Sequence, residues 1–155
     1  MRTFATAVLT AFLVAAPVHA LTAKQTVEKE NIVRNADGSE TRVRVPAETV
    51  TPGERVIYTV SFTNDQAQPA ANFVMTQPVP EEIVFVEGSA DKPGAEVTVS
   101  ADGGQTFTSR EAATVLRGET RVRASAEDIT HVRWKITEPL APGASDKVSY
   151  RGILK

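Results

Sequence analysis

The chain has 155 residues with 19 acidic and 17 basic side chains, and its net charge of −2 excludes the strongly positive surface that non-specific nucleic-acid binding needs. It has no cysteine, which excludes disulfides, a thiol nucleophile and cysteine-based zinc sites. The length fits a single domain, which must be held together by its hydrophobic core alone.

Residues 1–20 have the pattern of a secretory signal peptide. Arg2 makes the start positive, residues 4–16 are apolar apart from two threonines, and Val18-His19-Ala20 suits cleavage by a signal peptidase. The apolar run is shorter than the roughly 20 residues that cross a bilayer. We therefore expect cleavage after Ala20, export to the periplasm or the medium, and no stable transmembrane segment after cleavage.

Residues 21–47 are predicted to form an N-terminal hairpin that belongs to a β-sandwich. A weak strand pattern covers residues 26–34, and Asp37-Gly38 is a strong hairpin-turn signal. Residues 40–46 then alternate between valine or threonine and arginine, as a strand with two different faces does.

The clearest strand follows the turn at Pro52-Gly53. Proline and glycine suit the two central positions of a type II turn. Apolar residues at positions 56, 58, 60 and 62 then recur at period two, which predicts one buried and one mostly solvated face. Pro142-Gly143 is likewise a turn signal followed by an alternating segment, the last predicted strand.

Further short strands are predicted over residues 72–76, 83–86, 96–100 and 129–136, and Thr120 to Ala124 repeats the Thr-Arg-Val-Arg of the early hairpin. Asp102-Gly103-Gly104 predicts a second hairpin that returns through residues 106–108, whereas residues 111–116 could form one helical turn. Turn signals about every 8–12 residues favour an all-β fold, a single antiparallel β-sandwich of about seven to nine strands. The predicted core consists of Val56, Tyr58, Val60, Phe62, Phe85, Val97, Val99, Phe107, Val132, Trp134, Ile136, Val148 and Tyr150.

Several segments, taken in order, resemble a known family. Residues 51–64, 77–89, 99–107 and 132–143 are similar to the bacterial conserved-repeat domain, the domain of unknown function 11 family, although Gln77 and Glu82 depart from its usual Asp and Gly. The resemblance implies an immunoglobulin-like β-sandwich over residues 48–155, of a kind found in exported and cell-envelope proteins. It implies no reaction.

Candidate catalytic and ligand residues have simpler interpretations. His131 could be a base or metal ligand, but its place on a strand predicts an outward, solvent-facing side chain. Residues 35–40 space oxygen ligands as calcium loops do, but they lack the rest of such a loop. Trp134, Tyr58 and Tyr150 could line a sugar site, but their phase favours the core. We therefore expect no enzyme, no cofactor and no metal, and a small hydrolase is the least favoured hypothesis.

Basic residues recur at alternate positions on three predicted strands. They would form a basic face if two of these strands were neighbours, or a solvated face paired with glutamates if they were not. We predict a non-catalytic envelope interaction or structural module that contacts a protein through a sheet face or edge. The alternative is a module that binds an anionic glycan or lipid headgroup. The candidate binding residues are Arg42, Arg44, Arg121, Arg123, Arg133 and Lys135.

Overall fold

A computed structural model describes residues 21–155, so the predicted signal peptide lies outside the described residues. Over residues 21–155 the fold contains ten strands and one short 3₁₀ turn, Ala126–Asp128. In chain order the strands are β1 (Leu21–Arg34), β2 (Glu40–Pro46), β3 (Arg55–Asn64), β4 (Phe73–Pro78), β5 (Ile83–Phe85), β6 (Ala95–Ser100), β7 (Thr114–Arg117), β8 (Thr120–Arg123), β9 (His131–Ile136) and β10 (Ser145–Leu154).

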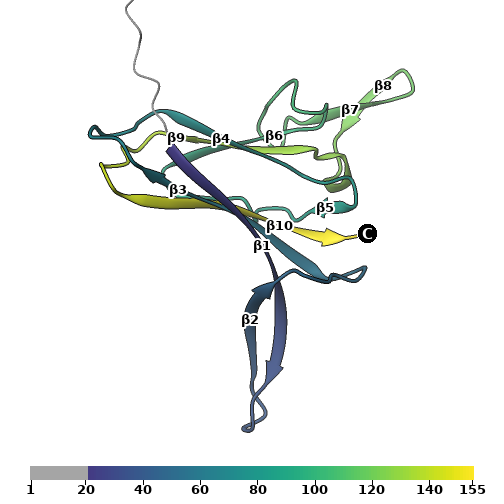
Figure 1. Cartoon of the computed structure of the whole chain (residues 1–155). Helices are drawn as coiled ribbons and strands as arrows, with labels where there is room; N and C mark the ends of the chain where they lie inside the picture. Colours follow the sequence, from purple (N-terminus) through teal and green to yellow (C-terminus); the bar gives the residue numbers. More distant parts are fainter. Residues whose placement is uncertain (1–20) are drawn as a thin grey trace, which may run out of the picture.

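The strands form two packed antiparallel layers, and this confirms the predicted all-β sandwich. One layer is a five-stranded sheet in the order β2-β1-β3-β10-β5, and the other is a three-stranded sheet in the order β4-β9-β6. Strands β7 and β8 form a separate hairpin beside the end of the second layer (Figure 1). In the described part of the chain, no helix is long and apolar enough to cross a membrane.

The core lies between the two layers. Trp134 and Val132 of β9 face Tyr150 and Val148 of β10, and all four are almost fully buried. The indole Nε1–H of Trp134 donates to the carbonyl of Ala90 at 2.7 Å, so the largest core side chain leaves no buried donor unsatisfied. The Tyr150 hydroxyl likewise donates to the carbonyl of Pro78 at 2.7 Å.

The two Pro-Gly turns are present as predicted. Gly53 and Gly143 both have positive φ, at 89° and 72°. Each turn is closed by a backbone hydrogen bond from the residue after its glycine, Glu54 to Thr51 and Ala144 to Ala141. The first turn leads into β3 and the second leads into β10. These two strands pair along almost their whole length at the centre of the larger sheet.

Some sequence-based predictions were wrong. The segment 111–116 is no helical turn, because Thr114 onward pairs with β8 as strand β7. The outer face of β3 is less solvated than expected, since Ile57 is 1% exposed and stands between Glu28 and Arg151 in the sheet register. The predicted core residues are buried except for three that are half-buried, namely Tyr58, Val97 and Phe107.

Phe107 is only half-buried because residues 106–108, the expected second strand of a hairpin, do not form a full strand. It makes a single bridge, from Thr108 to Val99. The Phe107 ring lies on the outer face of the smaller sheet, where the Arg133 guanidinium carbon sits 3.3 Å from the ring centroid. The aromatic ring therefore stacks on a cation instead of entering the core.

Trp134→Ala should lower the free energy of unfolding by about 3–5 kcal/mol, because it removes a large buried side chain and leaves the Ala90 carbonyl without its donor. Urea unfolding of wild type and variant measures the difference. Lys135→Ala, on the exposed face of the same strand, is the control and should change stability by less than about 0.5 kcal/mol. A loss of under about 1 kcal/mol for Trp134→Ala would contradict its place in the core.

Gly152→Ala should also destabilise the protein, by about 1–3 kcal/mol, because β10 passes very close to β5 at this point. A Cβ at position 152 would lie 2.1 Å from Cγ2 of buried Ile83 and 3.3 Å from the Val84 carbonyl oxygen. Denaturant unfolding of the single variants and of Gly152→Ala/Ile83→Ala tests this contact. The two changes should cost less together than the sum of their separate costs, and simple additivity would contradict the clash.

Candidate interaction surface

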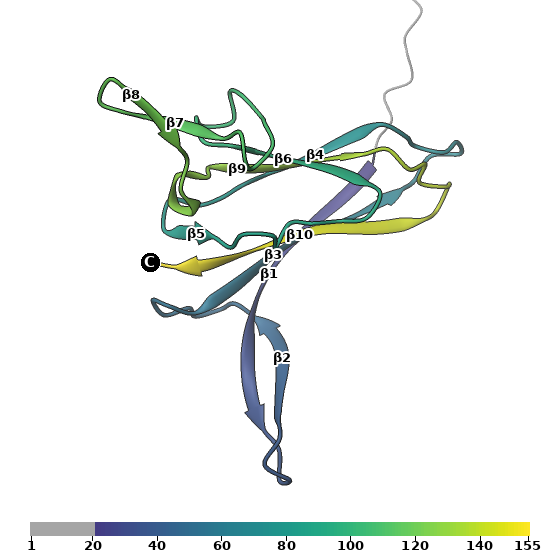
Figure 2. The same ribbon diagram turned by 180° about the vertical axis from the view of Figure 1, so that it is seen from behind.

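The end of β1 and strand β2 form an arm that projects from the sandwich (Figures 1 and 2). Strand β1 has 14 residues, but β3 pairs with it only from Leu21 to Lys29. Strand β2 pairs with β1 from Glu28 opposite Pro46 to Arg34 opposite Glu40, so residues 30–34 of β1 pair with β2 alone. We call residues 28–46 the arm.

The two faces of the arm carry different side chains. On one face, Glu30 lies opposite Arg44 and Ile32 opposite Arg42. On the other, Val33 and Val43 are 46% and 41% exposed, and Ile32 on the first face is 62% exposed. An isolated two-stranded hairpin with uncovered apolar residues is at most marginally stable in water, so this arm is suited to contact a partner.

The outer edge of β2 is open, and its register shows which backbone groups it offers. The amide of Ala47 donates to Val27 and the amide of Asn35 donates to Ser39, which places the odd-numbered residues of β2 in hydrogen-bonded pairs with β1. The N–H and C=O groups of Arg42 and Arg44 therefore point away from β1. Strand β2 is the last strand of its sheet, so no strand of the described chain pairs with them.

The predicted basic residues do not form one face. Arg42 and Arg44 lie on β2, Arg121 and Arg123 on β8, and the pair at 133 and 135 on β9. These strands belong to three different sheets, and none pairs with another. The identical Thr-Arg-Val-Arg segments thus occupy separate edges, so the condition for a single basic face, two neighbouring basic strands, is not met.

The fold instead gathers a different set of arginines around Glu30. Arg42 lies 3.7 Å from the Glu30 carboxylate, and Arg151 of β10 lies 3.8 Å from it on the other side. A shallow hollow of about 240 Å³ lies at the root of the arm, lined by Glu30 and Arg42 and by Arg55, which is exposed at the start of β3. Arg55 and Arg151 were not among the predicted binding residues, because alternation places each on a solvated face but does not say which strands are neighbours.

His131 does not face open solvent as predicted. Its ring lies 3.3 Å from where a Cβ of Gly104 would be and packs edge-on against Phe107 under the 101–107 loop. The hydrogen-bond contact found for the ring is with the neighbouring Thr130 hydroxyl, at 3.2 Å. Among residues 21–155, no carboxylate forms an ion pair or a hydrogen bond with the imidazole.

The Asn35–Glu40 segment is the hairpin turn of the arm, with Gly38 at a φ of 85°. The Asp37 carboxylate accepts the backbone and hydroxyl hydrogens of Ser39, and these bonds lower its pKa. Both of these bonds are accepted by Oδ1, which is thus used within the turn. Across residues 21–155, no three His, Asp or Glu side chains are grouped as a metal site would require.

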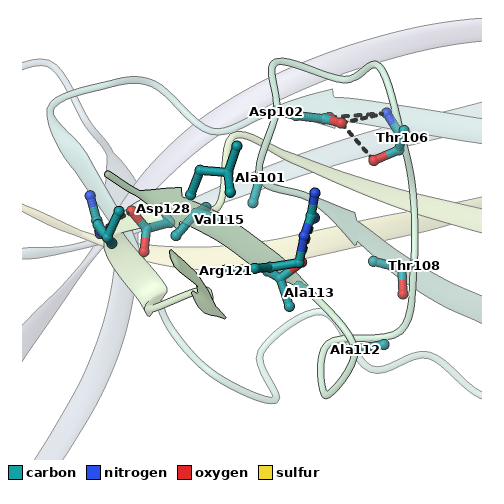
Figure 3. A pocket seen from close by; sticks show the side chains of 12 residues that line it. Ala101, Asp102, Thr106, Thr108, Ala112, Ala113, Val115, Arg121 and Asp128 are labelled. Atoms are coloured by element: carbon teal, nitrogen blue, oxygen red, sulfur yellow. Dashed lines mark hydrogen bonds and ion pairs between the residues drawn. The ribbon is translucent and has the colours of Figure 1, made fainter. Parts of the chain in front are cut away.

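A second hollow of about 500 Å³ lies between the 101–108 loop and the β7–β8 hairpin (Figure 3). Its charged groups are bound to each other or to the loops that carry them. Asp128 forms an ion pair with Arg117 at 2.6 Å, and Arg121 donates to the Thr114 hydroxyl at 3.1 Å. Asp102 accepts from the hydroxyls of Ser100 and Thr106, both at 2.6 Å. These contacts fix the loops around the hollow.

The Asp102 contacts predict how stability depends on pH. The hydrogen bonds from Ser100 and Thr106 hold the pKa of the Asp102 carboxyl well below its ordinary value. A depressed folded-state pKa stabilises the fold above the unfolded pKa of about 4, and that stabilisation is lost as the pH falls below it. Asp102→Asn should therefore have a lower free energy of unfolding than wild type at pH 7. This difference between the two proteins should become smaller as the pH falls toward 2.5.

Urea unfolding across this pH range measures the effect, with Glu119→Gln in the exposed β7–β8 turn as the control. Glu119 has no ion-pair or hydrogen-bond partner in the structure of residues 21–155. If the difference in free energy of unfolding between Asp102→Asn and wild type did not change with pH, the hydrogen bonds would not depend on the charge of the carboxylate.

Comparison of the chain with protein-family models, with curated proteins and with solved structures gave no match. The resemblance to the conserved-repeat domain therefore stays a prediction, and the case for function depends on the surface geometry.

Proposed function

We propose that this protein is a non-catalytic interaction module of the cell envelope, exported to the periplasm or the medium, and that it contacts a partner protein through the arm. The observation that carries the proposal is the open edge of β2, which stands clear of the sandwich (Figure 1). Natural proteins usually cover or block such edges, because free N–H and C=O groups recruit another strand. An edge that is both projecting and open supports a role in binding.

The binding of an anionic glycan or lipid headgroup by the arginines at the root of the arm is the second candidate. Arg42 and Arg55 line the hollow there, and Arg151 lies 3.8 Å from the Glu30 carboxylate, which favours an anion. Glu30, however, lies between Arg42 and Arg151 and already neutralises part of their charge, and its side chain is only 15% exposed. An anion would have to displace or approach this carboxylate, so the edge is the better supported contact.

Photo-cross-linking tests the proposal in cells. A photoreactive amino acid at position 43, on the arm, should give an adduct with an envelope protein, which protease digestion would remove. The same amino acid at position 116, exposed on the β7–β8 hairpin, is the matched control and should give none, since Leu116 is even more exposed than Val43.

Arg44→Pro should abolish this adduct without unfolding the hairpin, because the Arg44 N–H points outward and proline is tolerated at such edge positions. Thr76→Pro is the control on the edge strand β4 of the smaller sheet. Val79 donates to Thr130, which places odd residues of β4 in bonds with β9 and turns the Thr76 N–H outward. An adduct that is equal at positions 43 and 116, or insensitive to Arg44→Pro, would reject the arm as the contact. A protease-resistant adduct would favour the glycan or lipid candidate.

A further inference from the structure

We propose that the partner contributes an extended acidic segment that adds to β2 as a new strand, with acidic side chains opposite Arg42 and Arg44 and apolar side chains opposite Val43 and Val45. This inference rests on the proposed contact through the arm and specifies the chemistry of the segment that the arm receives. The partner strand would pair with the backbone of β2 and would alternate between acidic and apolar residues.

The backbone defines where the added strand would pair. Arg42 and Arg44 present their N–H and C=O groups at the open edge, whereas Pro46 has no N–H and ends the donor row. A strand added here forms its hydrogen-bonded pairs at the two arginines. Partner residues at those positions project on the same face as the guanidinium groups, with Cα atoms about 5.5 Å from the arginine Cα atoms.

The charges at this edge favour acidic residues in the partner. Arg44 is exposed and has no ion-pair partner among residues 21–155. Arg42 has a long contact of 3.7 Å with Glu30, and Glu40 is already bound to Arg34 at 2.8 Å. The edge therefore keeps unneutralised positive charge, and opposite charges placed directly across two strands stabilise their pairing.

The opposite face of the arm favours apolar residues between the acidic ones. Val43 and Val33 are exposed there, and Val45 lies beside them in a half-buried position. Because side chains alternate along a strand, the partner residues between the acidic positions would project over these valines. Their apolar side chains would cover surface that the sandwich leaves in water.

A second copy of the chain fits this edge less well than an acidic segment. In every antiparallel register that pairs most of two β2 strands, an arginine of one copy faces an arginine of the other, which is destabilising. The free edge of β1 is also a poorer site, since it begins only past the end of β3 and carries Glu30 and Ile32.

Peptide binding to the purified protein tests the inference. The probes are fluorescein-labelled heptapeptides that alternate Glu with Val, Gln with Val, or Lys with Val, and fluorescence anisotropy gives their dissociation constants. The Glu peptide should bind about 2- to 30-fold more tightly than the Gln peptide, as expected for two cross-strand charge pairs, and the Lys peptide should bind most weakly. Raising the salt from 50 to 300 mM should reduce the preference for Glu.

Variants show where the peptide binds. Arg44→Pro should weaken binding of both the Glu and the Gln peptide relative to Arg44→Gln, which loses the same charge but keeps the edge N–H, whereas Thr76→Pro should leave both unchanged. Arg42→Gln/Arg44→Gln keeps both edge N–H groups and should remove the preference for Glu while keeping residual binding. Circular dichroism and the unfolding midpoint check that each variant is folded.

The outcomes separate this inference from the proposed function. Equal binding of the Glu and Gln peptides, lost in Arg44→Pro, would overturn the acidic preference and leave the edge contact standing. Tight Glu-peptide binding that survives Arg44→Pro would overturn strand addition and favour an anion site on the arginine face. Failure of every peptide to bind, with a position-43 cross-link still present, would overturn the inference and retain the arm contact. A dimer in sedimentation that Arg44→Pro abolishes would assign the edge to a second copy and overturn the inference.

Discussion

The difference in length between β1 and β3 determines the shape of the molecule. The Pro52-Gly53 turn, held by the Glu54-to-Thr51 hydrogen bond and by the Gly53 amide on Leu154, starts β3 at Arg55. Pairing between β1 and β3 therefore ends at Lys29 opposite Val56, while β1 continues to Arg34. The unmatched end of β1 can pair only with β2, and the two strands leave the body of the sandwich as the arm. The same turn that organises the core thus produces the exposed surface.

Local periodicity predicted those elements whose environment is set within the strand. The alternation of β9 and β10 placed Trp134 and Tyr150 in the core, and the Pro-Gly turns came out with the expected positive φ. The β7 segment was less readable, because a short apolar run does not by itself distinguish a strand from a helical turn. Pairing with β8 decides its state, and this pairing depends on the Gly118 turn between them.

The candidate site was harder to predict, because it depends on which strands are neighbours. Residues 41–44 and 120–123 have the same sequence, yet one segment belongs to the arm and the other to the β7–β8 hairpin. Arg151 meets Glu30 only because β10 and β1 flank β3 on opposite sides. No local pattern encodes that order. The open edge also follows from a missing neighbour, which the sequence of β2 does not indicate.

The backbone, more than any single side chain, distinguishes the arm as an interaction surface. Charged residues are common on exposed strands, and their pairs contribute little when solvent screens them. A row of unpaired N–H and C=O groups is a directional feature that can specify both the position and the register of a partner strand. The arginines and valines of β2 then select among the segments that could occupy this position.

Backbone amide hydrogen exchange in the isolated monomer tests the open edge most directly. The amides of Thr41, Val43 and Val45 should be protected by their bonds to β1, whereas those of Arg42 and Arg44 should exchange much faster, near the rate of an unstructured chain. NMR resolves the individual residues, and sedimentation confirms that the sample is monomeric. Alternating protection along β2 would support the account. Arg42 and Arg44 amides protected as strongly as the Val43 amide would contradict it, because the edge would already be covered.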